Sequence, residues 1–212
     1  MKTSELFEKE IGLIKNEHMR NIVANTLDAS PECIQRIPAS ATGKYHPEYS
    51  LGKAGLSRHI KATVGIAYSM IGSEVLKGFL ENEVNDYNNT YEDVVYASLI
   101  LHDCCKPDDT PKHSTKFDHP LIGANLFKRV ATEYVKTSNL SKDNMDYMKK
   151  TIPLVFKCIK SHMGIYTTAS YAKGIELPKP ASNLEWFVHS CDLLSSKKYI
   201  GFDFDKYYQT LR

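Results

Sequence analysis

Apolar residues recur every three or four positions over most of the chain, and this spacing predicts amphipathic helices. Leu56, Ile60, Val64 and Ala67 show it most regularly. Six segments carry the pattern: 4–27, 56–80, 90–102, 119–137, 142–162 and 182–198. Strand patterns are weak throughout, so we expect an all-α fold in which the helices form a bundle.

Two of the predicted helices begin with a recognisable cap. Ser182 followed by Glu185 forms a capping box, in which each side chain binds a free backbone N–H of the first turn. Thr90 followed by Asp93 is a variant of the same signal. Both pairs predict where a helix starts.

Glycine and proline indicate where helices end or bend. Gly164 predicts the end of the segment 142–162, and Pro153 predicts a bend within it or a division into two helices. Polar stretches rich in proline and glycine predict loops, the first with a short helix, at 28–55, 104–118 and 164–181. The sequence pattern does not predict where the aromatic tail after residue 200 packs on the rest of the protein.

Composition and charge narrow the class of protein. With 212 residues, 42% hydrophobic and 25% charged, the chain is typical of one globular domain spanning residues 1–212. A net charge of +2 is too small for a surface that binds a large polyanion, but it allows a small anionic ligand.

The cysteines and the first residues of the chain indicate in which cellular compartment the protein is expected. The five cysteines are odd in number, Cys104 and Cys105 are adjacent, and no Cys-x-x-Cys pair occurs, which argues against a disulfide framework or a zinc ribbon. The first residues, MKTSELFEKE, are too acidic for a signal peptide. No apolar run reaches the roughly 20 residues that span a bilayer. We therefore expect a cytoplasmic protein without membrane segments.

Several ionisable residues lie on or beside the apolar stripes of separate predicted helices. They are His59, His102, His162 and Asp192. A buried carboxylate or imidazolium without a partner costs roughly several kcal/mol. A divalent metal would neutralise such groups together, and the interiors of helical bundles are common metal sites.

The order of five short motifs makes this signal more specific. They are GLSRHIKA, LILHDCCKPDD, DHPLIGANLF, CIKSHMG and VHSCDLLSS. This set resembles the HD-domain superfamily of metal-dependent phosphohydrolases over about residues 44–198, with 1–43 forming an N-terminal helix and loop packed on that core. The likeness is most specific at the step His102-Asp103, with Lys106 three residues on, and at His119-Pro120.

The resemblance implies a helical bundle of the HD-domain type around two divalent metals. One metal would be held by His59, His102, Asp103 and Asp192, and Asp103 would bridge to a second one held by His119 and His162. Simpler members of the superfamily hold one metal with the first set alone. Imidazole and carboxylate ligands suit Mn²⁺, Fe²⁺, Ni²⁺, Zn²⁺ or Mg²⁺.

Further polar residues near these motifs are candidates for contact with a substrate. Besides the catalytic Asp103, Lys106 is predicted to bind a phosphate, or else to be a solvated surface lysine. Arg58 could serve in the same way or lie on the surface. His113, in the polar loop, could protonate a leaving group or simply be exposed.

A second likeness covers GKYHPEYSLGKAGLSRH, which is similar to the lead-in to the HD domain of certain bacterial 3′-to-5′ exoribonucleases. The matching positions are His46, Gly52, Gly55 and Leu56, so His46 is a candidate for substrate binding. The chain lacks an obvious nucleic-acid-binding barrel, which sets it apart from those enzymes.

Four functions remain open at this point. The leading hypothesis is hydrolysis of a phosphate ester of a nucleotide or small nucleotide-like substrate by metal-activated hydroxide. The alternatives are a phosphodiesterase or exoribonuclease acting on single-stranded nucleic acid, a di-iron oxygenase of the HD fold, and a binding module in which metal only stabilises the bundle. The oligomeric state has no sequence signal.

Overall fold

The computed structural model describes residues 2–40, 42–84, 90–107, 115–172 and 174–211. Across these ranges the fold is all-helical, as the hydrophobic pattern predicts, and one isolated β-bridge joins Pro107 and Thr115. The α-helices are α1 (Glu8–Gly12), α2 (Glu17–Asp28), α3 (Gly55–Ile71), α4 (Glu74–Val84), α5 (Thr90–Leu101), α6 (His119–Thr137), α7 (Lys142–Ser161), α8 (Asn183–Ser195) and α9 (Phe204–Thr210).

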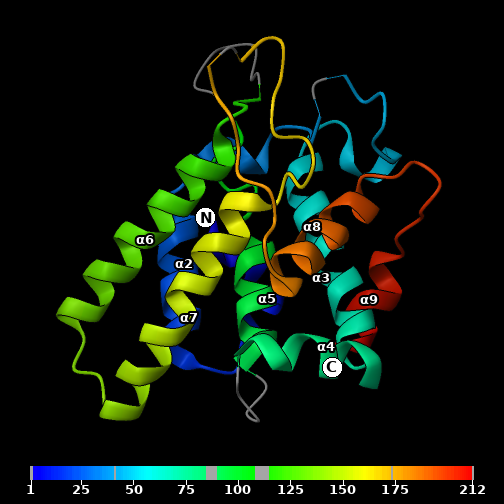
Figure 1. The fold of residues 1–212 in the computed structure, drawn as a ribbon. Helices are drawn as coiled ribbons and strands as arrows, with labels where there is room; N and C mark the ends of the chain where they lie inside the picture. The colour runs from blue at the N-terminus through cyan, green and yellow to red at the C-terminus, as the bar shows by residue number, and fades with distance from the viewer. Residues whose placement is uncertain (1, 41, 85–89, 108–114, 173, 212) are drawn as a thin grey trace.

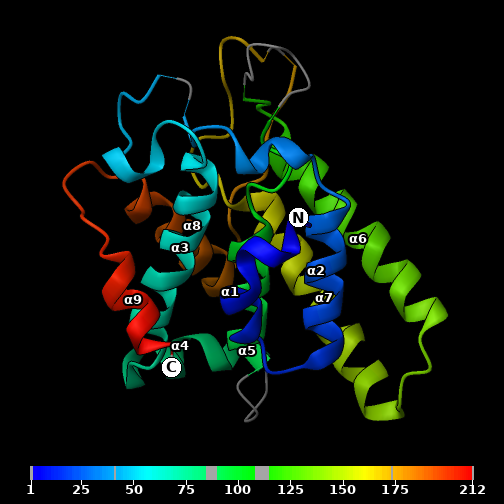
Figure 2. The same cartoon turned by 180° about the vertical axis from the view of Figure 1, so that it is seen from behind.

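Helix α5 is the centre of the bundle (Figures 1 and 2). It packs against α1, α2, α3, α4, α7 and α8, and every residue in it except Glu92 is buried. Its sequence, TYEDVVYASLIL, is apolar on all sides rather than along one stripe, which is typical of a helix surrounded by others.

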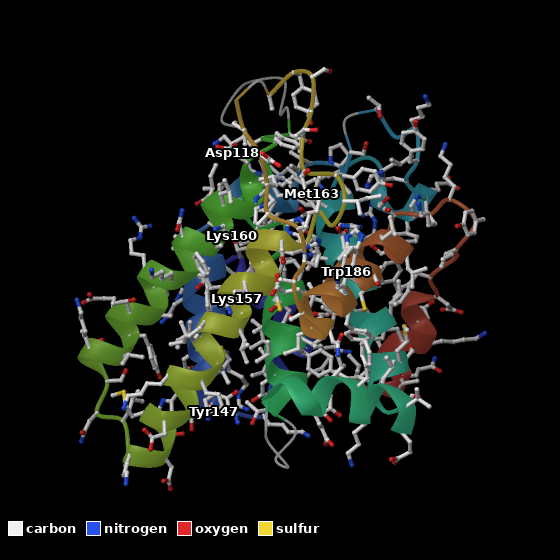
Figure 3. The ribbon with its side chains drawn as sticks, viewed as in Figure 1. Asp118, Tyr147, Lys157, Lys160, Met163 and Trp186 are labelled. Atoms are coloured by element: carbon white, nitrogen blue, oxygen red, sulfur yellow. The ribbon has the colours of Figure 1, made fainter. Side chains whose placement is uncertain are left out.

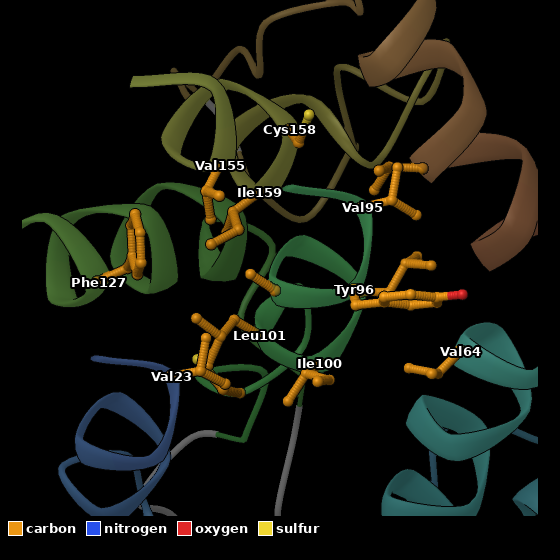
Figure 4. Packing of buried hydrophobic residues seen from close by; sticks show 14 of the residues in the cluster. Val23, Val64, Val95, Tyr96, Ile100, Leu101, Phe127, Val155, Cys158 and Ile159 are labelled. Atoms are coloured by element: carbon orange, nitrogen blue, oxygen red, sulfur yellow. The ribbon is translucent and has the colours of Figure 1, made fainter. Parts of the chain in front are cut away.

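The core around α5 is filled by side chains from several neighbouring helices. Figure 4 shows Ile100 and Leu101 of α5 close to Val23 of α2, and Val64 of α3 on the side of Tyr96. All of these side chains are buried, with exposed fractions of 3% or less.

The prediction of one continuous helix over residues 4–27 is wrong. A short 3₁₀ helix (Ser4–Phe7) and α1 come first, and α2 starts only after a break. The side chain of Asn16 accepts a hydrogen bond from the backbone N–H of Met19 and so caps α2. Within the break, Asp93 accepts from the N–H groups of Lys15 and Asn16, and Arg20 donates to the carbonyls of Ile14 and Lys15. These bonds replace the helical ones that the break removes.

The predicted helix 56–80 also divides, into α3 and α4, at Gly72 and Ser73. Helix α4 then turns to pack on α5 and α8. Helix α7, in contrast, is not split by Pro153, which is exposed. Solvent can therefore satisfy the backbone carbonyl one turn earlier, which receives no N–H from the proline.

The two predicted caps have different outcomes. Ser182 accepts from the N–H of Glu185, as the capping box requires, but the Glu185 carboxylate accepts instead from the N–H of Ala181 and the hydroxyl of Ser161. At α5, the Asp93 carboxylate accepts from the N–H groups of Lys15 and Asn16 in the break before α2, and the predicted box with Thr90 stays a prediction.

The first predicted loop and the C-terminal tail each contain short helices. The loop 28–55 contains two short 3₁₀ helices, Glu32–Gln35 and Glu48–Ser50. The aromatic tail forms α9, which lies beside α3 (Figures 1 and 2). None of the helices in the described ranges combines the length and the hydropathy that crossing a membrane requires.

Several long connections meet at one end of the bundle, the upper end in Figure 1. They are the loop before α3, the turn after α5 and the loop between α7 and α8. Helix α6 also begins there. Residues that end or begin these helices are therefore brought together although they are far apart in the sequence.

Candidate metal centre

The six residues predicted as metal ligands converge at this end of the bundle, and they come from five helices or their ends. They are His59 in α3, His102 and Asp103 in the turn after α5, His119 at the start of α6, His162 at the end of α7 and Asp192 in α8. Figure 3 labels Asp118 and Met163, the neighbours of two of them, near the upper ends of α6 and α7. All but Asp192 are almost fully buried.

Three of the six form a first group of candidate ligands: His59, His102 and Asp192. The Oδ1 atom of Asp192 lies 3.0 Å from His59 Nε2 and 3.6 Å from His102 Nε2. The two Nε2 atoms are 3.4 Å apart. The Asp192 side chain is 19% exposed, so this group borders on solvent.

The other three form a second group: Asp103, His119 and His162. The Oδ1 atom of Asp103 lies 2.9 Å from His119 Nε2 and 3.6 Å from His162 Nε2. These two nitrogens are 3.1 Å apart. Here every side chain is buried, with exposed fractions of 2% or less.

Asp103 also connects the two groups. Its Oδ2 atom lies 3.6 Å from His59 Nε2 and 3.5 Å from His102 Nε2, while its Oδ1 atom faces the second group. One carboxylate thus presents one oxygen to each group of ligand atoms.

The four clustered histidines all turn Nε2 toward the centre and hold Nδ1 in a hydrogen bond. Their Nδ1 partners are Ser195 Oγ for His59, and the carbonyls of Leu99, Lys116 and Ile159 for His102, His119 and His162. Ser195 Oγ donates to the carbonyl of Asp192 and therefore accepts from His59. These bonds place the ring proton on Nδ1 and leave the Nε2 lone pair for a metal.

The spacing of the donor atoms fits divalent ions. Atoms that share one ion at about 2.0–2.2 Å lie about 3.0–3.5 Å from each other in octahedral or tetrahedral geometry. The separations within the two groups run from 2.9 to 3.6 Å. In addition, the buried Oδ1 atom of Asp103 makes no hydrogen bond with any residue in the described ranges. A cation would satisfy this oxygen, and both groups are therefore able to hold metal ions.

The charge state of the carboxylates agrees with this role. Burial disfavours ionisation of Asp103, but the positive charges of Lys106 and His102 hold its pKa well below the usual value. For Asp192, burial is likewise outweighed by the adjacent imidazoles of His102 and His59, and the pKa is held well below its usual value. Both side chains are thus anionic at neutral pH, as ligands must be.

The pKa values of the buried imidazoles are shifted in opposite directions. Burial lowers the pKa of His59 and of His119, which favours the neutral form that binds metal. Burial acts in the same sense on His102, but Asp103 and Asp192 outweigh it and raise the pKa of His102.

The candidates for substrate contact are placed differently from one another. Lys106 lies within the centre, with Nζ 2.6 Å from Asp103 Oδ2 and a side chain 15% exposed. His46 is adjacent, its ring centroid 5.8 Å from that of His59. Arg58 donates from Nε and Nη2 to the carbonyls of Tyr49 and Leu51, so its guanidinium supports the loop before α3. His113 lies outside the described residues.

Ser195 and His189 support the candidate ligands, and only Ser195 was not predicted from the sequence. Ser195 holds His59, and its only signal is its position three residues after Asp192 on one face of α8. His189 donates from Nδ1 to the carbonyl of His162. Gly164 leaves room for the His189 ring and takes φ +63°, a conformation that side chains disfavour.

No protein-family model, curated protein or solved structure matches the chain. The resemblance to the HD-domain superfamily therefore stays a prediction from the sequence.

Proposed function

We propose that the protein is a metal-dependent phosphohydrolase that cleaves a phosphate ester of a nucleotide or small nucleotide-like substrate. The observation that supports this best is the position of Asp103, whose two oxygens face two adjacent groups of ligand atoms. A pair of ions that share a carboxylate suits phosphoryl transfer, because one side of the phosphorus then faces two positive charges. The order of the motifs along the chain supports the same proposal.

Divalent ions bound in such a pair supply Lewis acidity, which polarises a phosphoryl oxygen and makes water more acidic. The protein itself determines where such ions would bind, through Asp103 and through the four histidines whose rings are each held by a hydrogen bond at Nδ1. The second group is closed to solvent, whereas Asp192 is partly exposed. Substrate therefore approaches from the side of Asp192.

Lys106 supplies a further positive charge at the same place. Its ammonium contacts Asp103 Oδ2, the oxygen that also faces His59 and His102. Cations held by the ligand groups would repel this ammonium from Asp103. Lys106 would then be free to bind a non-bridging phosphate oxygen of the substrate, since an ammonium and a phosphate attract each other strongly at a partly buried site.

His46 contributes a hydrogen bond rather than a charge. Burial, together with the nearby His59 and Lys106, lowers the pKa of His46 to about 4, so the ring is neutral at physiological pH. Its Nδ1 atom is buried and makes no hydrogen bond within the part of the chain that the structure describes. This nitrogen orients a polar group of the substrate.

The proposal is tested by removing metals with a chelator, reloading the protein with each of Mn²⁺, Fe²⁺, Ni²⁺, Zn²⁺ and Mg²⁺, and measuring hydrolysis. p-Nitrophenyl phosphate, bis-p-nitrophenyl phosphate and a panel of nucleotides separate monoesterase from diesterase activity. We expect two ions per chain by elemental analysis and metal-dependent release of phosphate or alcohol. Degradation of single-stranded RNA alone would favour the nuclease, and oxygen uptake by the iron form would favour the oxygenase.

Asp103→Ala removes the shared carboxylate. We expect both ions and all hydrolysis to be lost while helix content by circular dichroism is retained. The metal-loaded wild type should exceed the variant in unfolding free energy by about 3 kcal/mol for each ion lost, the linkage expected at metal concentrations several hundred times the dissociation constant. Asp146→Ala, which removes an exposed carboxylate on α7, is the matched control. Hydrolysis by Asp103→Ala at the wild-type rate would refute the assignment.

A further inference from the structure

A second cavity lies on the outer side of α7, away from the candidate metal centre. It is a groove of about 510 Å³ between α6, α7 and the segment 178–181 that leads into α8. None of the six candidate ligands lines it. Its volume lies within the range of about 300–1,000 Å³ that is usual for small-ligand sites.

Four lysines from three parts of the chain surround this groove: Lys128, Lys157, Lys160 and Lys179. Lys157 and Lys160 lie on neighbouring turns of α7 (Figure 3). Within the described part of the chain, no carboxylate forms an ion pair with any of the four. Several ammonium groups around one cavity repel each other, so an anion bound there gains from all of them.

The one acidic residue in the lining, Glu185, offsets only part of the positive charge of the four lysines. Glu185 is buried, and its Oε2 atom accepts hydrogen bonds from Ser161 Oγ at 2.7 Å and from the N–H of Ala181 at 3.3 Å. Oε2 of Glu185 thus joins α7 to the start of α8, and the lining combines this one carboxylate with four lysines.

The inner surface of the groove is apolar. It is formed by Ile152, Pro153, Phe156 and Pro178. The ammonium groups of Lys128 and Lys160 stand 5.6 and 6.0 Å from the centroid of the Phe156 ring, so cations are already held beside an aromatic surface. A ligand that fills this groove needs both negative charges and a flat apolar part.

We infer that the groove is a second binding site, and that it binds a nucleoside phosphate. The phosphates contact the lysines, and the base lies against Phe156 and the neighbouring prolines. This inference does not depend on hydrolysis at the metal centre. The groove is nevertheless connected to the candidate metal centre, because Ser161 in the groove wall adjoins His162.

The test is calorimetric titration of the protein with ADP, with inorganic pyrophosphate and with adenosine, in the presence of a chelator so that metal-dependent binding is absent. Lys157→Gln/Lys160→Gln removes two of the groove's charges. Lys136→Gln/Lys149→Gln removes the same charge from α6 and α7 outside the groove. We expect wild type and control to bind ADP alike, and the groove variant to bind it about tenfold more weakly or worse, since charge-assisted hydrogen bonds are lost.

Phe156→Leu tests the aromatic part of the site. We expect it to weaken binding of ADP while leaving that of pyrophosphate unchanged, and the comparison within one variant is independent of any change in its stability. Equal affinity of the groove variant and the control for ADP would overturn the inference, as would an absence of binding by wild type. Binding of pyrophosphate as tight as that of ADP, with no effect of Phe156→Leu, would refute the nucleoside assignment.

Discussion

Ser195 illustrates how a residue outside a ligand set can fix one of its members. Its hydroxyl donates to the carbonyl of Asp192 at 2.8 Å and lies 3.0 Å from Nδ1 of His59. A single side chain in α8 therefore sets the ring orientation and the tautomer of a histidine in α3. Both His59 and Asp192 belong to the first ligand group, so Ser195 affects that group directly.

Ser195→Ala should weaken metal binding at the first group by about 10–100-fold, because the histidine loses the partner that orients it. Binding at the second group should be unchanged. Competition with a chromophoric chelator measures both affinities. Ser196→Ala is the matched control, since its hydroxyl binds only the carbonyl of Leu193. Identical affinities in the two variants would show that Ser195 does not position the ligand.

At the scale of elements, Asp93 of α5 joins three parts of the chain. Its carboxylate accepts from the N–H groups of Lys15 and Asn16, at 2.6 and 3.0 Å, and from the hydroxyl of Tyr147, at 2.6 Å. The start of α2 and helix α7 are thereby held to the central helix, whose far end carries His102 and Asp103.

Asp93→Ala should lower the free energy of unfolding by about 3 kcal/mol, because three donors in partly buried hydrogen bonds lose the carboxylate that they share. Urea denaturation followed by circular dichroism measures this difference. The exposed carboxylate of Asp143, in the first turn of α7, provides the comparison, and its change to alanine should cost well under about 1 kcal/mol. A similar cost for both variants would mean that the Asp93 bonds contribute little.

The contact of the tail with α3 depends on one glycine. A side chain at Gly65 would overlap the ring of Phe202 and crowd Tyr207, whereas a side chain at Gly78 in α4 would meet nothing. Gly65→Ala should therefore destabilise the fold by about 1–3 kcal/mol through overpacking. Gly78→Ala should stabilise it by about 0.5–1 kcal/mol through helix propensity. Thermal unfolding of the two variants should shift in opposite directions, and a stabilising Gly65→Ala would contradict the packing.

At the scale of the whole molecule, a buried polar cluster joins the two ends of the chain. Glu10 of α1 is fully buried, Tyr208 of α9 donates to it at 3.3 Å, and Lys61 of α3 approaches it at 3.9 Å and donates to the Tyr208 hydroxyl at 2.9 Å. Burial raises the pKa of Glu10 above its usual value of 4.5, in spite of the nearby Lys61. The folded state therefore binds this proton more tightly than the unfolded state does.

It follows that the contribution of Glu10 to stability decreases as the pH rises from the unfolded pKa through the folded pKa. Glu10→Gln removes this titration. Between about pH 4 and about pH 7 the melting temperature of wild type should fall relative to that of Glu10→Gln. Glu133→Gln, at an exposed position on α6, should follow the wild-type curve. Parallel curves for wild type and Glu10→Gln would show that this carboxylate titrates normally.

The sequence alone determined the class of fold and the helices with regular stripes. Helix α6 begins at His119 and ends at Thr137 as predicted, because its apolar period, its proline and its polar flanks all act locally. The same pattern predicted unbroken helices at 4–27 and 56–80. At 4–27 it failed because the break is stabilised by a distant partner, Asp93, which a local period does not contain. At 56–80 the chain leaves the helix at Gly72 and Ser73, and the N–H of Ser73 donates to the carbonyl of Met70.

For the candidate site, the resemblance of five ordered motifs to the HD-domain superfamily predicted the six candidate ligands. Only the tertiary structure decided that Asp103 turns one oxygen to each group, that Ser195 holds His59, and that Arg58 serves a loop. It also decided that lysines from α6, α7 and the segment before α8 surround one groove. These facts depend on how the helices pack, and packing brings together side chains whose separation in the sequence carries no signal of their contact.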